Sequence, residues 1–445
     1  MNLKQIYDYI IVGTGSGGAT VAKELSEKKK KILIIEYGPR FTETGELKVV
    51  QKVFLDPEKK LIKSDGGIFI GRARILGGSS YVAMGNAVTP PERILKEWGV
   101  NLSEELKSAK EDMRVELMPS HLIGEGTQRI IEGAKSLGWE MKPTPKCVDF
   151  SKCVGCGICM YGCPTNAKWT TLEYIDISTN NGADLLLNTE VTKVLQENGR
   201  AIGVRAIKDK SVIEIYGKNI ILSAGALETP RILQNSGIKK AGKGIGLDVF
   251  QSTYGYTKDV GMKNEPILAV YLDKFIEDKE LFPAPYMYPT LTLVRDLFKY
   301  KPDNYSMLNQ LKSLVKVRKI KAKRLIGMMT KIRDEITGEV RNDGSIIKSL
   351  TKNDQEKLDE AYEINKKILI ASGAKPETIT RGVYESGHPC CTAPMGEMVD
   401  KNQETEIANL FVSDASIFPS PLGMPPILTI VALSKKLSKY LLTNT

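Results

Sequence analysis

Histidine is scarce in this chain, and its scarcity narrows the possible acid–base chemistry. The 445 residues include two histidines, His121 and His388. Histidine is the side chain whose charge normally changes between pH 5 and 8, so any imidazole-based proton transfer depends on one of these two. His388 lies in the stretch 387–396 (GHPCCTAPMG), whereas His121 lies in no recognisable motif.

Long apolar runs are missing as well. No segment reaches the roughly 18 consecutive apolar residues that a membrane-spanning helix needs. Residues 7–12 already read as a buried strand, so we expect no signal peptide and a cytoplasmic protein. Nucleic-acid recognition motifs are absent, and we expect no nucleic-acid partner.

Basic residues outnumber acidic ones by 63 to 53, which gives a net charge of +10. A solvated, lysine-rich surface explains this excess, and an acidic partner such as a ferredoxin or an anionic membrane is the alternative. Segment 312–324 holds seven basic residues among apolar ones. It predicts either a solvated helix face or a helix lying on the inner face of a membrane, near a quinone or lipid.

The N-terminus reads as a strand, a glycine-rich turn, a helix and a second strand. The turn has the pattern G-x-G-x-x-G, in which the glycines allow a tight turn and a close approach of the backbone to a pyrophosphate. An acidic residue after the second strand is placed to accept hydrogen bonds from a ribose, which disfavours NADP. This dinucleotide-binding pattern predicts that the nucleotide contacts are Gly13, Gly15, Ser16, Gly17, Gly18 and Glu36.

Further segments resemble, in order and spacing, the blocks of the glucose-methanol-choline (GMC) family of FAD-dependent alcohol oxidoreductases. They are 71–80 (GRARILGGSS), 190–194 with 203–206, 220–230 (IILSAGALETP), 387–396, 409–414 (NLFVSD) and 425–429 (PPILT). The resemblance implies FAD rather than NAD, and an α/β fold with a Rossmann-type FAD-binding domain. It also implies that His388 lies over the flavin and accepts the substrate hydroxyl proton.

The resemblance assigns further FAD contacts along the chain. Asn86 is the nearest substitute for an asparagine of the family's active-site loop, because Ala83 stands at that position. Together with Asn86, the residues implied are Arg74, Gly77, Gly78, Ser79, Ser80, Val191, Ala224, Gly225, Asp414, Ala415, Pro426 and Thr429.

One position departs from the family. The residue that normally pairs with the catalytic histidine is Asn or His, and here it is Pro425. Proline has neither a side-chain hydrogen-bonding group nor a backbone N–H. Proton transfer would then rest on His388 alone or on a residue that no motif identifies.

Four cysteines follow the spacing C-x2-C-x2-C-x3-C that is typical of bacterial ferredoxins. Clustered cysteines in a reducing cytoplasm indicate metal binding rather than disulfides, so we expect an iron–sulfur cluster of the 4Fe–4S or 3Fe–4S type. Zinc, or cysteines without metal, are the alternatives, and Cys147, Cys390 or Cys391 could supply a further ligand. The predicted ligands are Cys153, Cys156, Cys159 and Cys163.

The length predicts two or three domains. We expect an FAD-binding domain at 1–241 with the cysteine-rich loop 147–168, a smaller α+β substrate domain with an antiparallel sheet at 242–385, and a return to the FAD-binding domain at 386–445. In the substrate domain we predict strands at 268–272 and 290–294, a hairpin of 325–332 with 340–341, and a helix capped by Thr351 and running to Ser372.

Three functions fit these observations. The first is an FAD-dependent dehydrogenase that oxidises a sugar, polyol or lipid-like alcohol and passes electrons through the cluster to a ferredoxin or quinone. The second is a flavin and iron–sulfur reductase of a C=C or carbonyl group, which Pro425 keeps open. The third is an electron-transfer flavoprotein subunit with little small-molecule chemistry of its own.

Overall fold

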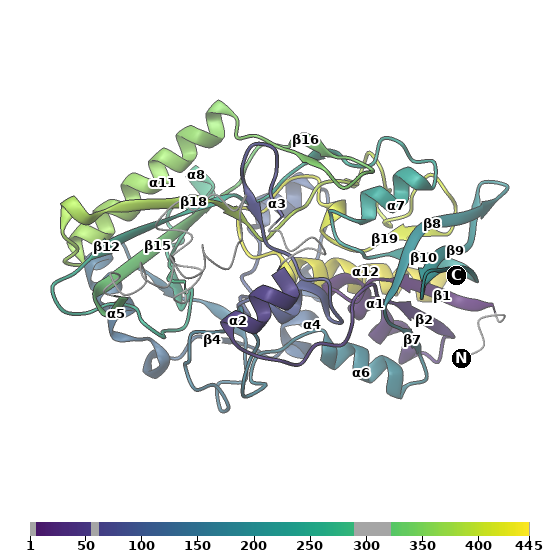
Figure 1. The fold of residues 1–445 in the computed structure, drawn as a ribbon, viewed down its shortest axis with the longest axis horizontal. Helices are drawn as coiled ribbons and strands as arrows, with labels where there is room; N and C mark the ends of the chain where they lie inside the picture. The colour runs from purple at the N-terminus through teal and green to yellow at the C-terminus, as the bar shows by residue number, and fades with distance from the viewer. Residues whose placement is uncertain (1–5, 55–61, 289–321, 445) are drawn as a thin grey trace.

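A computed structural model describes residues 6–54, 62–288 and 322–444. Figure 1 shows two regions, each built around its own sheet, with the N-terminal strands and the C-terminal helix in the same region. The predicted basic segment 312–324 and the predicted strand 290–294 lie wholly or almost wholly outside the described residues.

The first sheet confirms the predicted Rossmann-type unit. Its strands are ordered β7-β2-β1-β10-β9-β8, and β19 also pairs with β10. The strands β1, β2, β7 and β19 run parallel to their neighbours, and their apolar side chains are buried because helices cover the sheet. The bounds are β1 Tyr7–Val12, α1 Ser16–Ser26, β2 Ile32–Ile35, β7 Asp184–Leu186, β8 Thr189–Glu197, β9 Arg200–Lys208, β10 Ser211–Leu222 and β19 Leu410–Val412.

The C-terminal helix closes this region. Helix α12 (Ile427–Asn444) packs on α1 and on α4 (Ser103–Asp112), and α1 also contacts α6 (Leu172–Asn180). The ammonium of Lys435 on α12 lies 2.6 Å from Glu24 on α1 and 2.7 Å from Asp112 on α4. The C-terminal helix therefore packs against the N-terminal part of the chain.

The second sheet is antiparallel along most of its width, with the order β14-β15-β12-β18-β3. Helix α11 (Lys352–Ala371) packs on β12 and β15, and Figure 1 shows it along the outer side of this region. Thr351 and Asp354 form the predicted capping box at its start. The bounds are β3 Phe69–Ile70, β12 Phe250–Tyr256, β14 Leu281–Pro285, β15 Leu325–Ile332 and β18 Thr380–Ser386.

The predicted hairpin of 325–332 with 340–341 is wrong. Strand β15 already has β12 on one edge and β14 on the other. Strand β16 (Thr337–Val340) therefore pairs elsewhere, with β11 (Lys243–Ile245) and β17 (Ile346–Ile347). Of the predicted strand 268–272, the two residues of β13 (Val270–Tyr271) pair with β5 (Lys142–Pro143).

Shorter elements join the two sheets. They are α2 Glu46–Val49, α3 Glu92–Glu97, β4 Val115–Leu117, α5 Glu125–Ser136, β6 Pro145–Cys147, α7 Thr229–Asn235 and α8 Ile276–Lys279. Taken together, the parallel and antiparallel sheets confirm the predicted α/β fold class. The domain boundaries at 241 and 385 stay a prediction.

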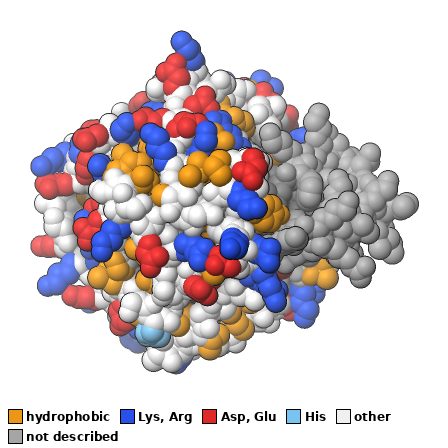
Figure 2. Space-filling model, turned by 90° about the vertical axis from the view of Figure 1, so that its left-hand side faces the viewer, with side chains coloured by type: hydrophobic (Ala, Val, Ile, Leu, Met, Phe, Trp, Pro, Cys, Tyr) orange, Lys and Arg blue, Asp and Glu red, His pale blue; other side chains and the backbone are white. Residues whose placement is uncertain are grey.

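The described surface carries both signs of charge. On the face drawn in Figure 2, Lys and Arg side chains are interspersed with Asp and Glu. No helix in the described ranges is both long and apolar enough to span a membrane.

Candidate active site

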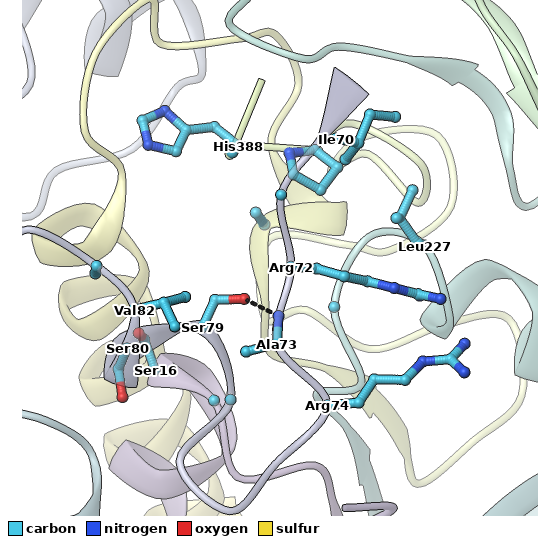
Figure 3. A pocket seen from close by; sticks show the side chains of 18 of the residues that line it. Ser16, Ile70, Arg72, Ala73, Arg74, Ser79, Ser80, Val82, Leu227 and His388 are labelled. Atoms are coloured by element: carbon cyan, nitrogen blue, oxygen red, sulfur yellow. Dashed lines mark hydrogen bonds between the residues drawn. The ribbon is translucent and has the colours of Figure 1, made fainter. Parts of the chain in front are cut away.

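A cavity of about 800 Å³ is lined from both sheets (Figure 3). Figure 3 shows His388 toward one end of it and Arg74 toward the other. Of the predicted site residues, Gly18, Gly77 and Thr429 lie behind its wall. Those that line it are Gly13, Gly15, Ser16, Gly17, Glu36, Arg74, Gly78, Ser79, Ser80, Asn86, Val191, Ala224, Gly225, Asp414, Ala415, Pro426 and His388.

The glycine-rich turn is packed tightly at one position and open at another. A Cβ on Gly17 would lie 1.6 Å from the carbonyl oxygen of Ser413, whereas a Cβ on Gly15 would meet no protein atom within 4 Å. The buried hydroxyl of Ser223 lines the same part of the cavity and has no hydrogen-bond partner within the described chain. Open space beside backbone N–H groups, with an unused hydroxyl, fits a pyrophosphate here.

The carboxylate of Glu36, predicted to contact the ribose, is fixed by neighbouring residues. It accepts hydrogen bonds from the hydroxyl of Thr14 at 2.5 Å and from the backbone N–H of Gly38 at 2.8 Å. Burial raises the pKa of Glu36, although these donors oppose that change. The carboxylate borders the cavity at the end of β2, and its contact with a ribose stays a prediction.

The segment 71–80 brings a group of arginines to the cavity wall, as Figure 3 shows for Arg72 and Arg74. Both guanidiniums, and that of Arg231, contact the carboxylate of Glu228. Burial by itself would raise the pKa of Glu228, but the three arginines outweigh it and lower the pKa to about 2. Three cations around one carboxylate leave a net positive charge, which suits the negative pyrophosphate of FAD. Of this group, sequence analysis identified Arg74 alone as a site residue.

Asp414 joins the ends of two strands at the cavity. Its carboxylate accepts hydrogen bonds from the backbone N–H groups of Gly225 and Ser416, each at 2.8 Å, and from the hydroxyl of Thr229 at 2.6 Å. These bonds connect the segments that follow β10 and β19. Burial raises the pKa of Asp414, and its contact with the ribityl chain stays a prediction. Thr429 is fully buried within α12.

His388 is paired with a carboxylate that the sequence did not reveal. Its Nδ1 lies 3.3 Å from Oδ2 of Asp248, and Oδ1 of Asp248 accepts the backbone N–H of Gly423 at 2.7 Å. The backbone N–H of Asp248 donates to Asp334, which forms a buried ion pair with Lys348. Asp248 is thus fixed on several sides, and it can hold the imidazole with Nε2 free for the cavity.

The electrostatics favour a neutral imidazole. Burial is the main cause that lowers the pKa of His388 well below 6.5, and the nearby cation of Lys331 lowers it further. The side chain is 19% exposed because it borders the cavity. A neutral imidazole with a hydrogen bond at Nδ1 can accept a proton at Nε2.

Lys331 is a second cavity residue that sequence analysis missed. It lies on β15 beside Met329, in a strand whose residues are all buried. Burial lowers its pKa to about 8, although Asp248 and Glu385 favour the charged form. The available signal was a lysine within the otherwise apolar run LIGMMTKI at 325–332.

Pro425 lines the cavity as the resemblance implied. Asn86, the substitute suggested for the family's asparagine, uses its side-chain oxygen to accept a hydrogen bond from Lys146 at 2.5 Å. Lys146 also contacts the carbonyl oxygens of Met84 and Ile267, so this ammonium fastens the loop that carries Asn86.

The four cysteines of the run surround one small hollow of about 30 Å³, together with Lys146 and Lys168. They are free thiols, and the described part of the chain contains no group of three or more potential ligands that converges on a metal position. Cys390 and Cys391 are buried and line neither this hollow nor the main cavity, and their sulfurs lie 3.4 Å apart. Thiols are suitable ligands for an iron–sulfur cluster, but these four do not converge on one metal position in the described chain, and the cluster stays a prediction.

Comparison with known protein families decides the classification. Family models described as GMC oxidoreductase match residues 7–253 and residues 326–434. The chain belongs to the GMC oxidoreductase family. Its family makes it an FAD-dependent GMC-type oxidoreductase acting on CH–OH groups, as the sequence resemblance predicted.

Relatives extend over nearly the whole chain. An uncharacterised protein of Methanocaldococcus jannaschii is 28% identical over 441 residues, which is 98% of this chain and 100% of that protein. A long-chain-alcohol oxidase of Arabidopsis thaliana is 24% identical over 522 residues, which is 98% of this chain and 68% of the oxidase. The crystal structure of pyridoxine 4-oxidase from Mesorbium loti has a TM-score of 0.74 at 16% identity, covers 99% of this chain and 100% of its own, and shows a common fold.

Proposed function

We propose that this GMC oxidoreductase is a dehydrogenase of an apolar, lipid-like alcohol, with His388 as the proton acceptor. The observation that carries the proposal is the pairing of His388, which borders the cavity of about 800 Å³, with the buried carboxylate of Asp248. FAD, when bound, supplies the hydride-accepting ring. The glycine-rich turn, the arginine group with Glu228 and the segments joined by Asp414 would hold it.

Each side chain at the catalytic end has a definable task. The carboxylate of Asp248 would accept a hydrogen bond from Nδ1–H of His388, and this tautomer leaves Nε2 as the base. Burial keeps the imidazole neutral, so the base is ready at neutral pH without prior deprotonation. A positioned base of this kind contributes about 10²–10⁴-fold to the rate of such a proton transfer.

Support for this substrate class comes from the lining of the cavity. Apolar side chains dominate there, and they would exclude water from a hydrocarbon chain rather than hydrogen-bond several hydroxyl groups. The similarity to a long-chain-alcohol oxidase points the same way. The apolar residues that line the cavity include Ile62, Phe69, Ile70, Val82, Phe250, Leu268 and Met329.

The direct test is flavin reduction under anaerobic conditions. We expect alcohols of increasing chain length to reduce the flavin with a rising kcat/KM. Each buried CH2 group should add roughly 0.8 kcal/mol to the binding free energy. Sugars and polyols serve as the matched hydrophilic controls and are expected to react poorly. A flavin that carbonyl compounds reoxidise, but that no alcohol reduces, would favour the reductase. A flavin reduced by a partner protein alone would favour the electron-transfer subunit.

We further infer that electrons leave through an iron–sulfur cluster on the cysteine loop. Support comes from proximity, since Met160 and Tyr161, within the cysteine run, line the main cavity. Support also comes from charge, because Lys146 and Lys168 are buried beside the thiols without a carboxylate partner in the described chain. Two buried cations suit an anionic cluster. A ferredoxin or a quinone would be the acceptor.

Replacing Cys156 with serine tests this electron route. The wild type prepared without oxygen is expected to contain iron and acid-labile sulfide, and Cys156→Ser is expected to lose both while it keeps its FAD. Cys391→Ser is the control, because Cys391 is equally a thiol but lies away from the hollow. Wild-type protein with zinc, or with neither iron nor sulfide, would contradict the cluster and leave the alcohol dehydrogenase reaction standing.

A further inference from the structure

Three side chains form a row across the second sheet on the side of the cavity. Phe250 on β12 lies opposite Lys331 on β15 and opposite Glu385 on β18. Residues directly opposite one another in neighbouring strands point to the same face of the sheet. All three line the same cavity as His388. The register of these strands therefore brings a cation and a carboxylate to the base.

The cation of this row is buried and has no anionic partner in contact. Lys331 is 4% exposed, and its ammonium lies 4.3 Å from the centre of the Phe250 ring. Within residues 6–54, 62–288 and 322–444, the ammonium of Lys331 forms no hydrogen bond or ion pair. The nearby carboxylates are already engaged, Asp248 with His388 and Glu385 with the hydroxyl of Tyr288. A buried ammonium in this state is costly unless a ligand contacts it.

The position where the family carries Asn or His has no hydrogen-bond donor in this chain, and Lys331 lines the same cavity. Pro425 lines the cavity and offers no donor to a substrate oxygen. The side-chain oxygen of Asn86 accepts a hydrogen bond from Lys146, which fixes the orientation of this amide. Lys331 lies close enough to His388 for its charge to act on the imidazole.

We propose that the Lys331 ammonium replaces the missing donor at Pro425 and holds the hydroxyl oxygen of a neutral alcohol while His388 takes the proton. This inference rests on the proposed alcohol dehydrogenase function and names Lys331 as a further catalytic residue of that reaction.

The step balances in atoms and charge. The substrate O–H bond breaks, its proton goes to Nε2 of His388, and the ammonium of Lys331 meets the negative charge that develops on oxygen. The carbinol C–H bond breaks with its electron pair, and FAD, when bound, would supply the two-electron acceptor for this hydride. The alcohol is thereby oxidised to a carbonyl compound.

The charges of the row favour a neutral alcohol over an anionic substrate. The carboxyl groups of Asp248 and Glu385 both act on Lys331, so a substrate carboxylate would meet them as well as the ammonium. An alkoxide that forms only in the transition state gains most from a fixed cation in a cavity that excludes water.

The kinetic test uses Lys331→Met, which keeps a chain of similar length and removes the charge. We expect kcat/KM for alcohols to fall by about 10²–10³-fold, the usual loss for one oxyanion donor. FAD content and thermal stability should be retained, because the substitution removes a buried charge rather than a stabilising contact. Lys243→Met removes the same charge from an exposed lysine on β11 that does not line the cavity, and this matched control should stay near wild-type activity.

The pH profile separates a catalytic cation from a structural one. Burial lowers the pKa of Lys331 to about 8, although the carboxyl groups of Asp248 and Glu385 favour its charged form. The other titratable groups near this site are His388 and Tyr288. The wild-type kcat/KM should therefore fall as the pH rises above about 8. Lys331→Arg should restore part of the activity and lose this alkaline limb, because guanidinium stays protonated.

A second readout needs no turnover. Because the chain has two histidines, ¹³C-labelled histidine yields two signals, and the exposed His121 serves as the reference. Removing the cation in Lys331→Met should raise the pKa of His388 toward its usual range. An unchanged His388 titration, a Lys331→Met enzyme as fast as wild type, or a loss limited to carboxylate-bearing alcohols would overturn the inference. If no alcohol reduces the wild-type flavin, the proposed function fails first and this inference with it.

Discussion

His388→Ala is expected to slow reduction of the flavin by alcohol about 10²–10⁴-fold, the range for loss of a positioned base. Hydride leaves an alcohol carbon readily when its hydroxyl proton is removed, and in the proposed function Nε2 of His388 removes that proton. FAD content should not change, because the turn around Gly15 and the corner at Asp414 are untouched. Stopped-flow reduction at saturating alcohol provides the measurement.

His121→Ala is the matched control, since His121 lies on the surface and should leave the rate unchanged. The low pKa of His388, caused mainly by burial, predicts an acid limb of kcat/KM well below pH 6.5. An unfolded histidine binds a proton near pH 6.5 and the folded one does not, so this group lowers stability as the pH falls below about 6.5. An alanine variant that reduces its flavin at wild-type speed would make His388 structural and favour the reductase or electron-transfer function.

Gly17→Ala is expected to lose most of the bound FAD and to lower the stability of the folded protein. Its Cβ would lie 1.6 Å from the carbonyl oxygen of Ser413, so the turn and the end of β19 must move apart. Overpacking of this kind costs about 1–3 kcal/mol or more, and each ~1.4 kcal/mol that falls on cofactor binding weakens it tenfold. FAD content after purification and the melting temperature of the apoprotein measure the two effects.

Gly15→Ala, two residues away, should separate cofactor binding from folding. Gly15 has a φ of −65°, which alanine adopts easily, and its Cβ would meet no protein atom within 4 Å. The apoprotein should keep its stability, while the added methyl group occupies the space that a pyrophosphate needs. Full FAD affinity in Gly15→Ala would show that the cofactor does not approach the turn at this point.

Local sequence patterns were enough to predict the fold of the nucleotide-binding half of the molecule. The strand at 7–12, the glycine-rich turn and the helix that follows are neighbours in sequence, so their order and spacing define the unit. The capped helix α11 was predicted for the same reason. The pairing of 325–332 with 340–341 was predicted wrongly, because β12 and β14 compete for both edges of β15.

The sequence predicted the residues around the catalytic histidine only in part. The sequence by itself determined the family, the FAD-binding fold and His388 as the candidate base, because these depend on short motifs with fixed spacing. Only the tertiary structure decided which groups surround that base. Asp248 and Lys331 come from segments 140 and 57 residues before His388, and no local pattern connects them. Their meeting depends on the register of β12, β15 and β18, which is set by packing of the whole sheet rather than by any one strand.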